Sequence, residues 1–341
     1  MSRASELVSG DCSTASCVGQ NPMITNHSSP AMSVVLITPD CYETIDLTMA
    51  HLLPQSVRDQ LEIVIVAPSA DGLAADESAL ATFHSFQVVE VGEIKAVGEA
   101  NAAGARRARA PVVAFVEEHS YPQPGWAEAL MEAHRQPWAA VGPVVDNANG
   151  DSLVGWADFH VGYGPWLDPS RAGVRDSLPG HNSSYKLALL LEYGPELEDM
   201  LESETTLHAD LRRKDHQLYL EPAARFSHLN FEKLSIWLGA QYYSGRAFAA
   251  QRAEHWPLGR GLLYVVGGPL IPFVRLRRAL EQVRGARGRL APPAAVWPVL
   301  LLGLGVSAAG EMIGYSCGAG DAVERRCDLE FYRARHVKAE R

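Results

Sequence analysis

The segment Glu117-Glu118-His119 directly follows the apolar run from Pro111 to Val116. Side chains two residues apart in an extended segment point to the same side, so Glu117 and His119 can meet one cation. A carboxylate with an imidazole is a reasonable ligand set for Mn²⁺, and an acceptable one for Mg²⁺ that keeps some of its waters. The spacing is therefore compatible with a divalent-cation site here. The alternative is a solvated acidic turn.

The elements that must position this segment are apolar, β-branched runs alternating with helical stretches. Strands are expected at 33–38, 61–67, 87–91, 111–116 and 218–222, and helices at about 43–53, 99–108, 126–134, 186–192 and 196–214. This alternation predicts a doubly wound α/β sheet with helices on both faces. Ligands of such sheets bind beyond the carboxyl ends of the strands. The residues that follow Thr38, Val66 and Val116 are therefore the first candidates for binding.

Composition and charge limit the class of protein. The chain has 341 residues, of which 47% are hydrophobic and 21% charged, which excludes a disordered or fibrous protein. A net charge of −10 argues against a general nucleic-acid binder. Residues 252–290 nevertheless hold eight arginines and two acids, a net charge of +6, so the remainder carries −16. This asymmetry predicts a basic face whose partner is an anionic surface.

The cysteines and the N-terminus indicate the compartment. The five cysteines are scattered and form no C-x-x-C motif, which favours a reducing compartment over a disulfide framework or a zinc knuckle. Residues 1–31 are rich in polar residues and lack an apolar run of signal-peptide length. We expect a disordered tail there and a protein that is not secreted.

The C-terminal third divides into a helical basic segment (236–290), an apolar membrane-associating segment (291–316) and a polar tail (317–341). Residues 294–310 carry no charge over seventeen positions and include Pro298. A full transmembrane helix needs about 20 residues, so a short or tilted span, a re-entrant segment, an interfacial helix and a buried core helix all remain open. The arginines between 275 and 289 favour association with the cytoplasmic face of a membrane.

Several motifs occur in an order that resembles the inverting glycosyltransferases of family 2, which have the GT-A fold. The run 112–119 resembles the strand that ends in that family's Asp-x-Asp motif, and Asn101 to Gly104 resembles the helix before it. Three downstream segments also match, in the family's order: Gly180-His-Asn-Ser-Ser-Tyr185, Glu202-Ser-Glu-Thr-Thr-Leu207 and Glu221-Pro-Ala-Ala-Arg-Phe-Ser-His228. The resemblance spans about residues 32–230.

This resemblance implies a GT-A type mixed sheet over residues 32–235 and assigns roles to residues. Glu117, His119 and His228 would hold Mn²⁺ or Mg²⁺, and Glu204, with Glu202 as its substitute, would be the catalytic base. The residues expected to bind the nucleotide-sugar are Thr38, Pro39, Asp40, Glu118, His181 and Asn182. Glu43 and Asp71 are alternatives to Asp40 for contacting the nucleotide. The chain departs from the family where Glu-Glu-His replaces Asp-x-Asp, and where Ala67-Pro68 replaces the acidic residue after the second strand.

The leading hypothesis is an inverting, metal-assisted glycosyltransferase that moves a single sugar from a nucleotide-diphosphate sugar to a glycan or lipid-linked acceptor. The Gln-x-x-Arg-Trp motif of processive synthases is absent. The rival is a non-catalytic sugar-nucleotide or glycan-binding module on the membrane, which the altered Asp-x-Asp motif favours. An unrelated nucleotide-binding α/β protein is disfavoured, because neither G-x-G-x-x-G after the first strand nor G-x-x-x-x-G-K-[ST] occurs.

Overall fold

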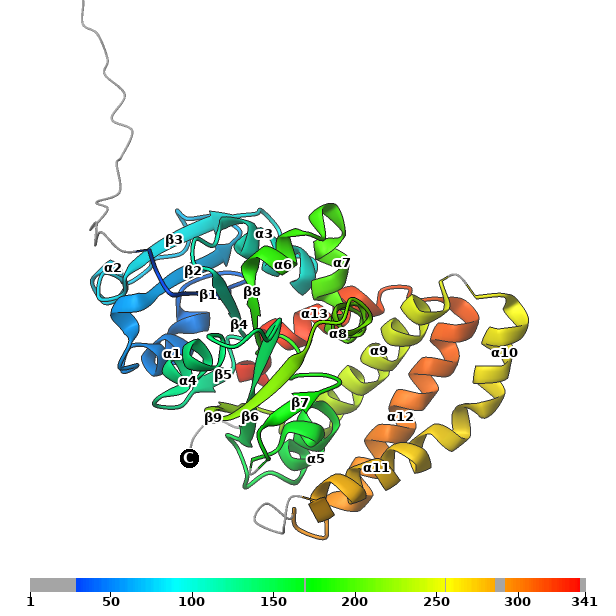
Figure 1. Ribbon diagram of the computed structural model, residues 1–341. Coiled ribbons are helices and arrows are strands. Elements are labelled where there is room, and N and C mark those ends of the chain that lie inside the picture. Colours follow the sequence, from blue (N-terminus) through cyan, green and yellow to red (C-terminus); the bar gives the residue numbers. More distant parts are fainter. Residues whose placement is uncertain (1–28, 169, 255, 286–291, 338–341) are drawn as a thin grey trace, which may run out of the picture.

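The computed structural model describes residues 29–168, 170–254, 256–285 and 292–337 (Figure 1). All but the last three residues of the predicted N-terminal tail lie outside these ranges, as do Arg287 and Arg289. In the described chain, nine strands form one sheet in the order β3-β2-β1-β4-β8-β6-β9-β5, with β7 paired to β9. The strands are β1 (Met32–Ile37), β2 (Leu61–Ala67), β3 (Ser85–Glu90), β4 (Val112–Val116), β5 (Ser120–Pro122), β6 (Ala140–Asn147), β7 (Gly173–Arg175), β8 (Ser184–Lys186) and β9 (Leu218–His228).

One half of the sheet is parallel and the other is mixed, as predicted. Strands β1, β2, β3 and β4 run parallel, and β1, β2 and β4 are buried along their whole length. This double burial is why their sequences read as continuous apolar runs. In the other half, β8 is antiparallel to β4 and β6, and β6 is parallel to β9. The short β5 pairs antiparallel with the end of β9, where Ser120 lies opposite His228. This pairing brings the segment after β4 against the last strand.

Helices cover both faces of the sheet. Their bounds are α1 (Glu43–Leu52), α2 (Glu77–Leu80), α3 (Val97–Arg107), α4 (Trp126–Ala133), α5 (Leu153–Tyr163), α6 (Leu187–Leu191), α7 (Leu197–Glu202) and α8 (Glu204–Arg213). Alternate residues of β1 pack into the two hydrophobic cores, one on each face of the sheet. Val35 and Ile37 pack with residues of α3, α7 and α8, whereas Val34 and Leu36 pack with residues of α1 and α4. This alternation follows from the two-residue period of a strand.

The C-terminal part is helical and stands beside the sheet (Figure 1). Its helices are α9 (Leu234–Ala253), α10 (Leu258–Gly267), α11 (Ile271–Gly285), α12 (Val296–Cys317) and α13 (Ala322–Phe331). Helices α9 and α12 touch along their backbones, since a Cβ added at Gly245, Gly310 or Gly314 would overlap backbone atoms of the facing helix. Small residues allow this approach, as they do between membrane helices.

Helix α12 covers residues 296–316 of the predicted apolar segment (291–316) and extends past the uncharged run, which ends at residue 310. Pro298 lies in the first turn, where a missing amide hydrogen costs no helical bond, so it does not break the helix. The helix continues past residue 310 because Glu311, which is 2% exposed, pairs with Arg275. Among the described residues, α12 alone is long and apolar enough to cross a membrane, with 22 residues and a hydropathy of 1.7. Of its apolar stretch, 44% is buried inside the protein.

Candidate active site

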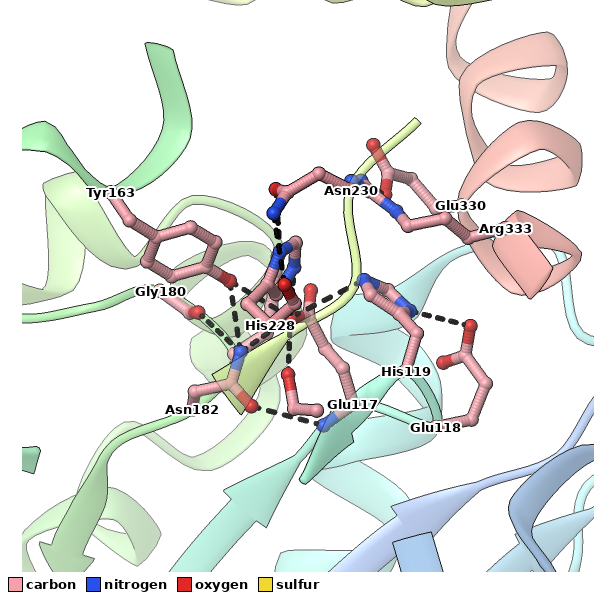
Figure 2. Close-up of polar contacts among 12 residues, drawn as sticks. Glu117, Glu118, His119, Tyr163, Gly180, Asn182, His228, Asn230, Glu330 and Arg333 are labelled. Carbon is pink, nitrogen blue, oxygen red and sulfur yellow. Dashed lines mark hydrogen bonds and ion pairs between the residues drawn. The ribbon is translucent and has the colours of Figure 1, made fainter. Parts of the chain in front are cut away.

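Glu117 lies at the carboxyl end of β4, with two buried histidines beside it (Figure 2). Glu117 Oε2 is 3.7 Å from His119 Nε2 and 3.5 Å from His228 Nε2. One potential ligand atom from each of the three residues lies within 4.8 Å of the others. The structure therefore brings together the three predicted metal ligands, two from the segment after β4 and one from the end of β9.

The outer partners of the two histidines aim them at Glu117. His119 Nδ1 lies 2.7 Å from Glu118 Oε1, and His228 Nδ1 lies 2.9 Å from Asn230 Oδ1. Both oxygens are acceptors, so each Nδ1 is the donor and each Nε2 faces the shared site. His119 Nε2 is buried and has no hydrogen-bond partner in the described chain. A carboxylate–histidine pair of this kind is the usual outer support of a metal ligand, so these residues fit a divalent cation.

Asn182 and Tyr163 hold the Glu117 carboxylate from the other side (Figure 2). The Asn182 Nδ2 group donates to Glu117 Oε2, and Asn182 Oδ1 accepts from the Glu117 amide at 3.2 Å. The Tyr163 hydroxyl donates to the same Oε2 at 2.9 Å. Asn182 was predicted to bind the sugar-nucleotide, but its amide is engaged with Glu117 here. Its position is that of a residue that orients the carboxylate.

The charges around Glu117 keep it ionised. Burial opposes ionisation, but His119, His228 and His181 outweigh burial and hold the pKa of the Glu117 carboxyl well below its usual range. Burial lowers the pKa of His228 to about 4, so this ring is neutral near pH 7. Glu117 and His228 are therefore in the protonation states that bind a metal. Burial opposes the charged form of His119, but Glu118 raises the pKa of this second imidazole.

Glu204 is the first residue of α8, at a break between two helices. The sequence predicts one helix over 196–214, but Ser203 interrupts it with φ −131° and ψ 76°. Glu204 is 5% exposed, and its Oε1 accepts a hydrogen bond from the His181 amide at 2.6 Å. Burial opposes the charged form of His181, but Glu204 raises the pKa of this imidazole to about 9. The two side chains therefore form an ion pair, with 3.3 Å between Nδ1 and Oε1.

Glu202, the alternative base, is engaged with structural partners. Its Oε2 accepts from the Gly98 amide at 2.8 Å, and its Oε1 pairs with Arg326 of α13. These contacts tie α3, α7 and α13 together. Both oxygens of Glu202 are therefore engaged with other helices. In Glu204, the contacts with His181 involve Oε1.

A cavity of about 1060 Å³ joins these groups. Glu117, His228, Tyr163, His181 and Glu204 line one end of it. Thr38, Pro39 and Asp40 do not line this cavity. Asp40 lies at the carboxyl end of β1, where its Oδ1 accepts from Thr44 Oγ1 and its Oδ2 lies 3.1 Å from Arg335.

The segment predicted to be a polar tail contributes to the site instead. It contains α13 and the following turn, and Arg333 in that turn is 6% exposed. Arg333 pairs with Asp158 of α5 at 2.8 Å and with Glu330 (Figure 2). Both Glu330 and Arg333 line the cavity. Sequence reasoning missed them because the local pattern around Arg333 is that of an ordinary solvated charged segment.

Comparisons with known proteins agree with this architecture. The model of the family described as glycosyl transferase family 2 matches residues 33–190, and no curated protein matches the chain. The mannosyltransferase PcManGT from Pyrobaculum calidifontis, solved with GDP-Man and Mn²⁺, has a similar structure, with a TM-score of 0.53 and 15% identity. That alignment covers 86% of this chain and 90% of PcManGT.

Two further solved structures are more distant. GalNAc-T7, solved with UDP, GalNAc and Mn²⁺, gives a TM-score of 0.46 at 13% identity, over 58% of this chain and 43% of its own. S. aureus TarS gives 0.44 at 13% identity, over 85% of this chain and 90% of the TarS chain. Residues 33–190 therefore match glycosyl transferase family 2, and the chain shares the GT-A architecture of PcManGT.

Proposed function

We propose that the protein transfers a single sugar, with inversion, from a nucleotide-diphosphate sugar to the hydroxyl of a glycan or lipid-linked acceptor. The observation that carries this proposal is the arrangement of two carboxylates in one cavity. Glu117 faces His119 and His228 at one wall, and Glu204 begins α8 at another. Glu117 and the two histidines are suited to bind a cation, and Glu204 is suited to accept a proton.

Each residue then has a chemical task. Glu117, His119 and His228 would hold a divalent cation, which when bound neutralises charge on the diphosphate leaving group. Asn182 and Tyr163 orient Glu117 through their hydrogen bonds. Glu204 accepts the proton of the acceptor hydroxyl as its oxygen attacks the anomeric carbon. A single displacement from the face opposite the diphosphate inverts the configuration at that carbon.

A donor-hydrolysis screen of the purified protein tests this proposal. UDP-, GDP- and dTDP-sugars are incubated with Mn²⁺, with Mg²⁺ or with EDTA, and free nucleotide is measured. We expect release from one nucleotide class, with metal only. A donor that binds but is hydrolysed under none of these conditions, even with added acceptors, would instead support the non-catalytic binding module.

Gly180 gives a local test of Glu204. A Cβ at Gly180 would lie 2.7 Å from Glu204 Oε2, closer than real Cβ contacts, so Gly180→Ala must displace the carboxylate. Displacement of a catalytic group by about 1 Å lowers turnover by up to about 100-fold, and we expect a 10- to 100-fold loss with little change in Tm. Gly72→Ala is the control, because its Cβ would meet no atom within 4 Å. Equal turnover of the two variants would argue against the role of Glu204.

We also propose that α10 and α11 hold the enzyme to the cytoplasmic face of a membrane. Five large apolar side chains on α10, on α11 and on the turn between them are between 62% and 73% exposed: Leu262, Leu263, Val266, Leu270 and Phe273. Arginines flank them, and the aromatic rings of Trp256, Tyr264 and Tyr315 gather at the near end. Apolar faces edged by arginine and aromatic residues are typical of helices at an anionic lipid interface.

Cosedimentation with anionic vesicles tests this membrane contact. Leu262→Asp with Val266→Asp removes two side chains whose burial in the acyl region contributes about 3 kcal/mol, so binding at high salt should weaken about 100-fold. Leu47→Asp on α1 is the control, since Leu47 is also 54% exposed. If the double variant binds as tightly as the control, these helices do not contact the membrane.

A further inference from the structure

A second cavity of about 570 Å³ is lined by residues of α9, α10, α11 and α12. Its walls are mostly apolar. The apolar and aromatic residues that line it are Phe248, Leu263, Tyr264, Leu270, Ile271, Val274 and Tyr315. The mechanism above assigns no role to this groove, although it adjoins the exposed apolar face of α10 and α11.

The groove and the catalytic cavity share part of their lining. Phe248, Arg275, Arg278 and Glu311 line both. The catalytic cavity extends from Glu204 past α9 to these four residues. The two cavities are therefore adjacent, and a molecule that reaches across these four residues would have one end in the catalytic cavity and the other among apolar side chains.

The junction carries an excess of positive charge. Arg275 is paired with Glu311 at 2.6 Å. The Arg278 side chain makes no ion pair or hydrogen bond with any residue that the structure describes, and it is exposed. Arg252, at the edge of the groove, donates to the Tyr315 and Tyr264 hydroxyls, each at 3.3 Å. Arg275 and Arg252 both act on the charge of Glu311, and Arg278 adds a third positive charge to the lining of the groove. An anion bound beside Arg275 and Arg278 would compensate this excess.

We infer that the acceptor is a lipid-linked sugar phosphate, with its chain in the groove, its phosphate at Arg275 and Arg278, and its sugar in the catalytic cavity. This inference rests on the proposed transferase activity. The acceptor hydroxyl forms the new bond to the anomeric carbon, its proton goes to Glu204, and the bond from that carbon to the nucleoside diphosphate breaks. The apolar groove would bind the lipid chain, and Arg278, which has no ion-pair partner in the described structure, would bind the phosphate.

Binding of geranylgeranyl phosphate to the full-length protein in a non-ionic detergent, without donor, tests the site. Gly267 lines the groove, and a Cβ there would meet no atom within 4 Å. Gly267→Leu should therefore fill the groove without displacing its walls, and we expect affinity to fall at least tenfold. Gly259→Leu is the matched control on the same helix, since it is equally open and lies outside the groove.

The phosphate contact is tested by a second pair of variants. Arg278→Gln should weaken binding about tenfold, because a charge-assisted contact is lost. Arg277→Gln is the control, since Arg277 pairs with Glu281 and lines neither cavity. Geranylgeraniol, which lacks the phosphate, should bind the wild-type protein as weakly as geranylgeranyl phosphate binds Arg278→Gln. If Gly267→Leu has a lowered Tm, the affinity of Arg278→Gln for geranylgeranyl phosphate still tests the site.

Three results would overturn the inference. The first is absence of geranylgeranyl phosphate binding in a wild-type protein that hydrolyses its donor, which would leave the transferase proposal standing. The second is equal affinity in each variant and its control. The third is equal competition by phosphatidic acid, which would assign the arginines to membrane headgroups. Specific lipid-phosphate binding by a protein that hydrolyses no donor would instead retain the groove and reject the transferase proposal.

Discussion

Replacing Glu117 with glutamine should abolish the metal dependence of nucleotide binding and lower turnover by at least about 1000-fold. A bound cation would stabilise the charge on the diphosphate leaving group by several kcal/mol, and each 1.4 kcal/mol corresponds to about a tenfold change in rate. The substitution keeps the shape of the side chain and removes the charge that His119 and His228 face. Calorimetric titration of the nucleotide with Mn²⁺ and with EDTA measures the effect.

Glu93→Gln is the control for this experiment, since Glu93 is an exposed carboxylate whose ion-pair partner is Lys95. Glu93→Gln should bind nucleotide as the wild type does, with the same dependence on Mn²⁺. If the wild-type protein itself binds nucleotide equally well with Mn²⁺ and with EDTA, the three residues do not form a functional metal site.

Glu204→Gln should lower turnover by about 10²- to 10⁴-fold with little change in donor affinity, the usual range for loss of a general base. Glutamine keeps an oxygen to accept the His181 amide, so the loop before β8 should stay in place. Steady-state kinetics with saturating donor measure the change in turnover, and the KM for the donor shows whether binding is preserved.

Glu202→Gln separates the two carboxylates. It weakens the contact with Arg326 and should lower Tm, while turnover falls much less than in Glu204→Gln. The reverse outcome, with Glu204→Gln active and Glu202→Gln inactive but folded, would transfer the role of base to Glu202.

The parallel half of the fold is readable from sequence because its central strands are buried on both faces. Apolar runs such as Leu61–Ala67 have no other stable place in a soluble domain. The three-residue strands β5, β7 and β8 were not predicted, since three residues show no hydrophobic period and their pairing depends on the rest of the sheet.

The candidate site also has a part that could be predicted from the sequence and a part that could not. Glu117 and His119 are neighbours in sequence, and the strand before them fixes where they lie. The hydrogen bond from Asn182 to Glu117 and the ion pair between Arg333 and Asp158 connect residues that are distant in sequence. No local pattern encodes such pairs, because tertiary packing of several elements creates them.

The Asp158–Arg333 ion pair also sets an order of assembly during synthesis. The two residues are 175 positions apart, so the ribosome completes the whole sheet long before the guanidinium emerges. Until then, the carboxylate of Asp158 on α5 lacks the guanidinium that it pairs with in the complete fold. A nascent chain that stalls in α12 can thus form its strands, yet the wall behind the histidines remains open and hydrated. Catalytic competence should consequently appear only after the region around Arg333 has left the exit tunnel.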